Sequence, residues 1–180
     1  VTQNIDLMPT FLDIHNHSIP SEVKGKSLLS YLDKDAESKF TALYGYWGGG
    51  INITDGKFSY FHYPENFSQQ NPDRYQYTLM PTHMRQFFSN EELQTATLHK
   101  PFDFTKDIPL LKINRIERKT DGGYKGFEDT KSALYNLQND PGQLTPLADE
   151  KKSNEYQQMM IDIINEYDPP KELIKNYFEN

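Results

Sequence analysis

Apolar and polar positions follow a helical period in the last part of the chain. Between residues 151 and 167, large apolar side chains recur at intervals of three or four residues, which is the spacing of one face of an amphipathic helix. They are Tyr156, Met159, Met160, Ile163, Ile164 and Tyr167. The Asp-Pro-Pro run at 168–170 ends this helix, and its second proline suits the first turn of a last helix predicted at 171–178.

A second helical pattern lies near the start, at residues 6–14. Leu7, Phe11 and Ile14 belong to an apolar stripe at helical spacing. Pro9 fits this interpretation because proline is tolerated in the first turn of a helix. The polar residues that follow end the predicted helix.

The middle of the chain predicts β-strands instead. Segments rich in aromatic and β-branched residues lie at 41–47, 51–54 and 57–63, and two further strands are predicted at 75–80 and, from its apolar residues, at 108–116. Asp55 and Gly56 predict a hairpin with a two-residue turn of the mirror-image type, which needs positive φ. A short helical stretch is predicted at 82–98, where Ser89 caps with Glu92 three residues later.

These elements predict an α+β fold, a small and mainly antiparallel sheet with flanking helices. The chain has 180 residues, and its 36% apolar fraction includes 12 Tyr and 11 Phe, enough to bury a core. The net charge of −7 and the scattered basic residues argue against nucleic acid as a partner. No apolar run approaches the roughly 20 residues of a membrane span, so we expect no membrane partner and a cytoplasmic location.

Few segments offer metal or anion chemistry. The absence of cysteine excludes a thiolate metal site or a cysteine nucleophile in this chain. Asp13, His15 and His17 alternate as metal ligands on a strand would. A helix is predicted just before them, however, and would place the two imidazoles about 200° apart, so we interpret both as exposed and predict no metal site. The WGGG run at 47–50 permits an anion site of backbone N–H groups, but a flexible hairpin link is the simpler interpretation.

Candidate binding residues lie between residues 64 and 127. His83 and Arg85 stand in PTHMRQFF, and Lys100 and Lys106 lie in KPFDFTK. The guanidinium of Arg matches a sulfate or carboxylate, and His and Lys add donors. We predict that His83, Arg85 and Lys106 face an anionic substrate; solvated surface is the alternative for each. The many Tyr and Phe residues form either a sugar-stacking platform or core packing.

The segment at 133–149, ALYNLQNDPGQLTPLAD, has residue types, order and spacing that resemble one family. It is similar to the LYDLxxDPxExxNLA signature near the C-terminal end of sulfatases of the alkaline-phosphatase superfamily. The residues in register are Leu134, Tyr135, Asn136, Leu137, Asp140, Pro141, Leu147 and Ala148. Gln143 and Pro146 depart from the signature, since the family often has Glu and Asn there.

The start of the chain resembles a second sulfatase segment, DxxPTLLxLAGxxxPxxxxGxSLxPLL. The matching residues are Asp6, Pro9, Thr10, Leu12, Pro20, Gly25, Ser27, Leu28 and Leu29. In the family, a hairpin with a DGKYKYI-like run precedes the LYDL strand in a small antiparallel sheet, and KFSYFHY at 57–63 fits that place. The resemblance implies that 1–33 end the sulfatase core and that 34–180 form the C-terminal subdomain. It also implies an insertion at about 64–127, whose YTLMPTHMR and PFDFTK blocks resemble a bacterial branch.

The resemblance implies that the full-length protein is a sulfuric ester hydrolase acting on a sulfated small molecule or sugar. In the family, a formylglycine made from Cys or Ser in CxPSR and the Asp and Asn ligands of a divalent cation such as calcium lie upstream of the DxxPTLL block. This chain contains no counterpart of either. We therefore predict no catalytic residue, cofactor or metal ligand here, an inactive chain on its own, and the missing N-terminal catalytic domain as its partner.

Three other interpretations stay open at this point. The full-length protein could belong to the phosphatase or phosphonate-hydrolase side of the same superfamily. The chain could instead be a free-standing glycan-binding module. The DIHNH run leaves a metal hydrolase as the third alternative.

Overall fold

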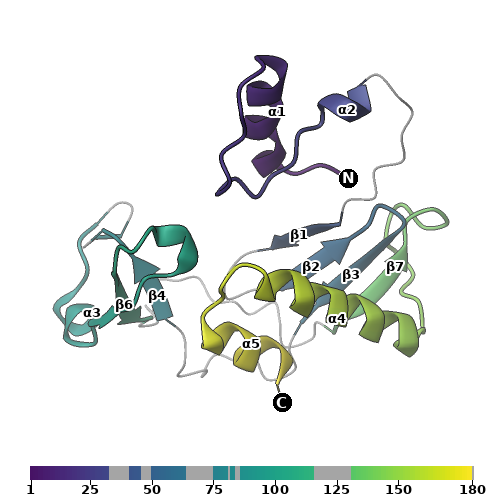
Figure 1. Ribbon diagram of the computed structural model, residues 1–180. Helices are drawn as coiled ribbons and strands as arrows, with labels where there is room; N and C mark the ends of the chain where they lie inside the picture. Colours follow the sequence, from purple (N-terminus) through teal and green to yellow (C-terminus); the bar gives the residue numbers. More distant parts are fainter. Residues whose placement is uncertain are drawn as a thin grey trace.

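The computed structural model describes residues 1–32, 41–45, 50–63, 75–80, 82–83, 86–115 and 131–179. Within these residues the fold mixes α-helices with two antiparallel sheets (Figure 1). Sheet A has the strand order β1-β2-β3-β7, and sheet B has the order β4-β6-β5. The predicted antiparallel α+β class is thus confirmed, but the strands form two sheets instead of one. The reason is that the three strands between residues 75 and 114 pair with one another.

The elements have the following bounds. Sheet A contains β1 (Ala42–Gly45), β2 (Ile51–Thr54), β3 (Phe58–His62) and β7 (Ala133–Asn136), and sheet B contains β4 (Tyr75–Thr78), β5 (Thr97–His99) and β6 (Leu110–Asn114). The helices are η1 (Asn4–Asp6), α1 (Leu7–Ile14), α2 (Leu29–Leu32), α3 (Asn90–Gln94), η2 (Asp103–Thr105), α4 (Glu150–Asn165) and α5 (Lys171–Phe178).

One predicted helix is too long. Among the described residues of the stretch at 82–98, only α3 is α-helical, and the end of the stretch forms strand β5, where Leu98 pairs with Leu111. Thr97 is β-branched and favours an extended backbone, so the helix gives way to a strand. Ser89 does cap α3 as predicted: its hydroxyl accepts from the N–H of Glu92, and the Glu92 carboxylate accepts from the N–H of Ser89.

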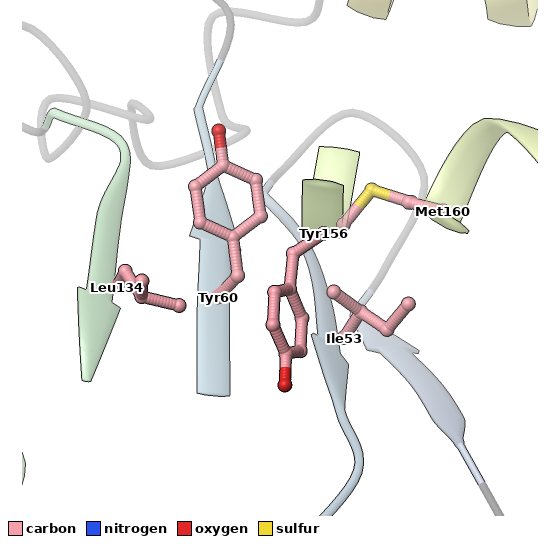
Figure 2. Close-up of a cluster of buried hydrophobic side chains, with 5 residues drawn as sticks. All are labelled: Ile53, Tyr60, Leu134, Tyr156 and Met160. Atoms are coloured by element: carbon pink, nitrogen blue, oxygen red, sulfur yellow. The ribbon is translucent and has the colours of Figure 1, made fainter. Parts of the chain in front are cut away.

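Helix α4 covers one face of sheet A and closes the main core (Figure 1). Figure 2 shows Tyr156 and Met160 of α4 facing side chains of the sheet. The core cluster consists of Ile53, Tyr60, Leu134, Tyr156 and Met160. The buried stripe of α4 is narrower than predicted, because Met159 and Tyr167 are 36% and 40% exposed.

The β2–β3 hairpin differs from the prediction in its turn. Thr54 pairs with Ser59, so four residues connect the paired positions instead of two. Gly56 has the predicted positive φ, 86°, whereas Asp55 does not. The Asp55 carboxylate accepts from the N–H groups of Lys57 and Phe58, both at 2.8 Å. This side-chain closure replaces the tight mirror-image turn.

The segment around α1 is held by hydrogen bonds to the chain that follows it. The Asp6 carboxylate accepts from the backbone N–H of Lys26 at 3.0 Å, and the Thr10 hydroxyl accepts from the N–H of Leu28 at 2.9 Å. At Gly25, an added Cβ would lie 1.9 Å from the carbonyl oxygen of Ile5. Glycine is therefore required where the two segments touch. None of the helices in the described ranges has both the length and the apolar character needed to cross a membrane.

Candidate functional site

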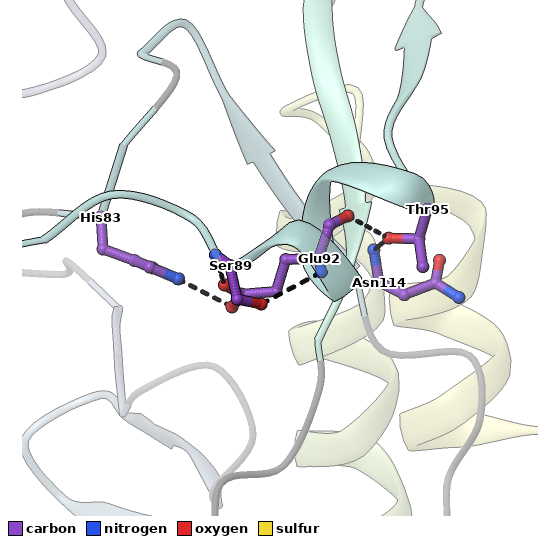
Figure 3. Close-up of polar contacts among 5 residues, drawn as sticks. All are labelled: His83, Ser89, Glu92, Thr95 and Asn114. Atoms are coloured by element: carbon purple, nitrogen blue, oxygen red, sulfur yellow. Dashed lines mark hydrogen bonds and ion pairs between the residues drawn. The ribbon is translucent and has the colours of Figure 1, made fainter.

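His83, one of the predicted binding residues, contacts a buried carboxylate (Figure 3). Its Nε2 lies 2.8 Å from Oε1 of Glu92, whose side chain is 3% exposed. The imidazole also packs on Phe88, with ring centroids 4.3 Å apart. His83 itself keeps 21% of its side chain exposed. Glu92 and Phe88 therefore hold the imidazole ring in place, and part of the side chain remains exposed to solvent.

Local structure explains why Glu92 is buried there. Glu92 is the third residue of α3, and its other carboxylate oxygen accepts from the N–H of Ser89 at 2.7 Å. The Thr95 hydroxyl donates to the carbonyl of Glu92 and accepts from the N–H of Asn114 in β6 (Figure 3). These bonds attach the short helix to the central strand of sheet B, so the position of Glu92 is determined by backbone structure.

The electrostatics of the pair determine what His83 can do. Burial opposes ionisation of Glu92, but the N–H of Ser89 and the imidazole of His83 donate to its carboxylate and hold its pKa below the ordinary value. An ionised carboxylate only accepts, so Nε2 of His83 carries the proton that is donated. In the neutral ring, Nδ1 then holds the lone pair, and in the protonated ring it becomes a second donor. The pair can accept a proton or bind an anion.

The other two predicted site residues do not join this pair. Arg85 lies outside the described residues. Lys106 has an exposed ammonium group that pairs with Glu22 at 3.0 Å, and within the described chain no hydrogen bond or ion pair joins it to His83. Lys106 sits at the end of η2 with φ 50°, next to Asp107 with φ 63°. A role for Lys106 in substrate binding stays a prediction.

A second polar cluster, which the sequence did not indicate, joins sheet B to α5. The ammonium of Lys112 in β6 pairs with the carboxylate of Glu172, and the hydroxyl of Tyr77 donates to the same carboxylate at 2.7 Å. The Lys112 ammonium also lies 3.8 Å from the ring centroid of Tyr75. Burial and the hydrogen bond to Glu172 raise the pKa of Tyr77 to about 12. Because Glu172 compensates Lys112, we interpret the cluster as a structural link.

The other end of α5 is held by sheet A. His62 of β3 is 6% exposed, and its Nε2 lies 2.6 Å from the carbonyl oxygen of Tyr177. Its ring stacks on Phe178 with centroids 4.8 Å apart and an angle of 9° between the planes. Burial lowers the pKa of His62, so the native ring is neutral near pH 7. Helix α5 thus contacts both sheets through polar side chains.

The candidate metal ligands Asp13, His15 and His17 lie in the last turn of α1 and just after it. His15 follows the last residue of α1 and His17 comes after the turn, and both are exposed. Asp13 accepts a hydrogen bond from the hydroxyl of Ser27 at 2.5 Å. In the described part of the chain, no three His, Asp or Glu side chains come together as metal ligands would. Of the WGGG run, only Gly50 lies within the described residues, and a Cβ there would meet the ring of Tyr63 at 2.6 Å.

Comparison with known proteins finds no family model and no curated protein that matches the chain.

The sequence indicated His83 as a binding residue and the capping of α3 by Ser89 with Glu92, but not the contact between His83 and Glu92. The two residues are nine positions apart with a chain reversal between them, and the Thr82–Phe87 bridge is part of that reversal. Lys112 and Glu172 are 60 positions apart, so no local pattern predicts their pairing. One signal was available in the sequence: Lys112 lies inside the apolar strand pattern at 108–116. A partly buried lysine there needs a counterion, although the sequence does not say which one.

Proposed function

We propose that this chain is the C-terminal part of a sulfatase-type hydrolase of sulfate esters. In this proposal the nucleophile and the metal ligands lie elsewhere in the polypeptide. Sheet A and its helices pack beside the catalytic domain that carries those groups, and side chains of the insertion contact the substrate. The whole enzyme would require a divalent cation and formylglycine, and neither group belongs to this chain.

The pairing of β3 with β7 is the observation that carries the proposal. Residues 64–132 separate the hairpin from the LYNL strand, yet Tyr60 pairs directly with Leu134. The hairpin and the strand thus lie side by side in a small antiparallel sheet, which is the arrangement that the resemblance implies. An insertion that leaves this pairing intact is consistent with an addition to an older scaffold.

The signature residues after β7 have structural roles that explain their pattern. The Asn136 side chain accepts from the N–H of Gln138 at 3.0 Å, and the Asp140 carboxylate accepts from the N–H of Thr145 at 2.8 Å. The N–H groups of Thr145 and Leu144 hold the pKa of Asp140 below its ordinary value. The chain then returns, so that the N–H of Leu147 donates to the carbonyl of Leu134 at 2.7 Å. The resembling positions therefore specify one turn, which supports a shared structure.

The block at the start of the chain supports the proposal in the same way. Asp6, Thr10 and Gly25 all lie where α1 meets the segment at 25–28, and each of these residue types is needed for a hydrogen bond or for space. Two separate sets of matching residues thus form two closed local structures. Matches produced by chance are not expected to coincide with the residues that hold such local structures together.

The insertion supplies the substrate-binding part of the proposal. Glu92 holds the ring of His83 through Nε2, so Nδ1 is the atom that donates to an anion when the ring is protonated. A sulfate ester presents oxygen acceptors to such a donor. We propose that His83 and Arg85 contact the sulfate or the sugar part of the substrate. The same groups would bind a phosphate ester, so the reaction has to be tested with both.

Two measurements test this proposal. The coding sequence upstream of Val1 should encode CxPSR or SxPSR, and the full-length product should hydrolyse 4-methylumbelliferyl sulfate faster than the matching phosphate. The 180-residue chain alone should show no turnover of either ester. A coding sequence without either motif, or turnover by the purified chain clearly above a buffer control, would reject the proposal. Faster hydrolysis of the phosphate ester would indicate that the protein is a phosphatase of the same superfamily.

A further inference from the structure

The face of sheet A opposite α4 carries aromatic side chains around an amide. Tyr44, Asn52 and Phe61 occupy directly opposed positions on β1, β2 and β3. Opposed side chains of an antiparallel sheet project on the same side. Ile53 and Tyr60, one position along each strand, belong to the core under α4, so this row lies on the other face.

The rings on this outer face lean over the strand between them. The ring centroids of Tyr44 and Phe61 are 6.2 Å apart, and the planes are nearly perpendicular. The strands that carry them are two strand spacings apart, roughly 9.6 Å, so the rings converge above β2 and therefore above Asn52. Tyr135 of β7 extends the row, with its centroid 5.6 Å from that of Phe61.

Asn52 is the unusual member of this row. It is 9% exposed, and its side-chain carbonyl oxygen is buried without a hydrogen-bond partner in the described part of the chain. Buried polar atoms are nearly always hydrogen-bonded, because leaving one unpaired carries a free-energy cost. Replacing Asn52 with an apolar residue would avoid that cost. The amide therefore fits a ligand that supplies the missing donor.

The chemistry of the face indicates what the ligand is. The strand residues on this face, within the bounds of β1, β2, β3 and β7, carry no charged side chain: Ala42, Tyr44, Asn52, Thr54, Ser59, Phe61, Ala133 and Tyr135. The hydroxyls of Tyr44 and Ser59 are hydrogen-bonded to each other at 2.8 Å. The apolar ring of Phe61 beside an amide and hydroxyls matches a sugar ring, which has apolar C–H faces and hydroxyls at its edge. An uncharged face in a chain of net charge −7 favours a neutral sugar over a sulfated one.

We propose that the outer face of sheet A binds a neutral saccharide chain. A sugar ring packs on the face of Phe61, the ring of Tyr44 moves aside to pack against the edge of the sugar, and one sugar hydroxyl donates to the carbonyl oxygen of Asn52. Tyr44 is 42% exposed and lies on the edge strand β1, so its ring can turn aside and uncover the amide. This binding is independent of the sulfatase proposal, because it uses neither His83 nor any group outside this chain.

Affinity electrophoresis tests the proposal with the purified 180-residue chain. Native gels contain amylopectin, xylan or galactomannan, and titration calorimetry then uses maltohexaose, xylohexaose or mannohexaose. We expect one of the three neutral polysaccharides to retard the chain and the matching hexaose to bind. Tyr44→Ala and Asn52→Leu should each weaken binding about fivefold to tenfold, the loss of one neutral contact. Phe87→Ala, which truncates an 84% exposed ring near sheet B, should leave binding unchanged.

Asn52→Leu separates binding from folding. It removes an unpaired buried amide, so the variant should unfold at the same urea concentration as the parent chain or a higher one, while its affinity falls. Retention of the full affinity by both Tyr44→Ala and Asn52→Leu would overturn the proposal. Retardation by none of the three polysaccharides, or by chondroitin sulfate alone, would also overturn it.

Discussion

Sheet A and sheet B are stabilised in different ways. Sheet A packs against α4 through a contiguous core in which Ile53 and Met160 are completely buried. In the region of sheet B, Ile113, Leu110, Phe88 and Phe102 are buried, but every residue of β4 is only half-buried and Leu98 of β5 is 74% exposed. Sheet B also carries polar contacts, among them the pairs His83–Glu92 and Lys112–Glu172. Apolar packing against α4 therefore stabilises the first sheet, whereas the second combines buried apolar side chains with side-chain ion pairs and hydrogen bonds.

Helix α5 lies between these two regions (Figure 1). Its first turn contacts sheet B through Glu172, and its last turn contacts sheet A through Tyr177 and Phe178. The backbone N–H of Asp103 adds a hydrogen bond to Asp168 in the connection before α5, at 3.1 Å. Helix α5 therefore links the core of sheet A to sheet B.

The largest effect should come from the core of sheet A. Leu134 is 1% exposed, so Leu134→Ala should lower the free energy of unfolding by about 2–5 kcal/mol. Urea unfolding followed by circular dichroism measures this loss. As a control, Leu98→Ala in sheet B should change the stability by less than about 0.5 kcal/mol, because Leu98 is mostly exposed. Equal losses from the two variants would remove the distinction between the sheets.

A smaller and more local effect is expected from Glu172→Gln. The change leaves the half-buried ammonium of Lys112 without its counterion and should cost about 1.5–3 kcal/mol. Hydrogen exchange should show the loss in β4 and β6 while sheet A stays protected. The double variant Lys112→Met with Glu172→Leu should recover most of the stability, because no unpaired charge remains. Uniform loss of protection across both sheets would show that α5 does not act as a local link.

A substitution in the β2–β3 turn should lower the free energy of unfolding by slightly more than about 1 kcal/mol. Gly56 has φ 86°, which a β-branched residue resists, so Gly56→Val should cost somewhat more than about 1 kcal/mol. Gly142→Val is the comparison, because Gly142 does not have positive φ and a Cβ there has ordinary contacts. An unchanged unfolding midpoint for Gly56→Val would contradict the turn geometry.

The contrast between the sheets also explains what the sequence could predict. Strand β2 and helix α5 have the predicted bounds, because alternating or helical apolar patterns and flanking turn residues are local signals. The end of the predicted helix at 82–98 was wrong, because the pairing of Leu98 with Leu111 overrides the helical pattern. The pairing of His83 with Glu92 and of Lys112 with Glu172 depends on how the chain turns back on itself. The period of apolar residues in the sequence gives no information about such turns.

Acid should weaken the attachment of α5 to sheet A. The folded-state pKa of His62 is lowered from 6.5, so the native ring stays neutral where the unfolded one takes up a proton. The stabilisation is complete above about pH 6.5 and decreases as the pH falls from there toward the lowered value. Urea midpoints at pH 7.5 and pH 5.5 measure this decrease. In His62→Gln, whose amide still donates to the carbonyl of Tyr177, the decrease should be smaller; an identical decrease would rule out His62 as its cause.

The most direct test of the functional account is the specificity constant of the full-length protein on an aryl sulfate. Loss of one charged hydrogen bond costs about 1.5–3 kcal/mol, so His83→Ala and Arg85→Ala should each lower kcat/KM roughly ten- to a hundredfold. Lys151→Ala, which removes an exposed cation from the first turn of α4, should stay within about twofold. Circular dichroism establishes that all three variants are folded. Values of kcat/KM within about twofold of the parent for both His83→Ala and Arg85→Ala would contradict a substrate-binding role for the insertion.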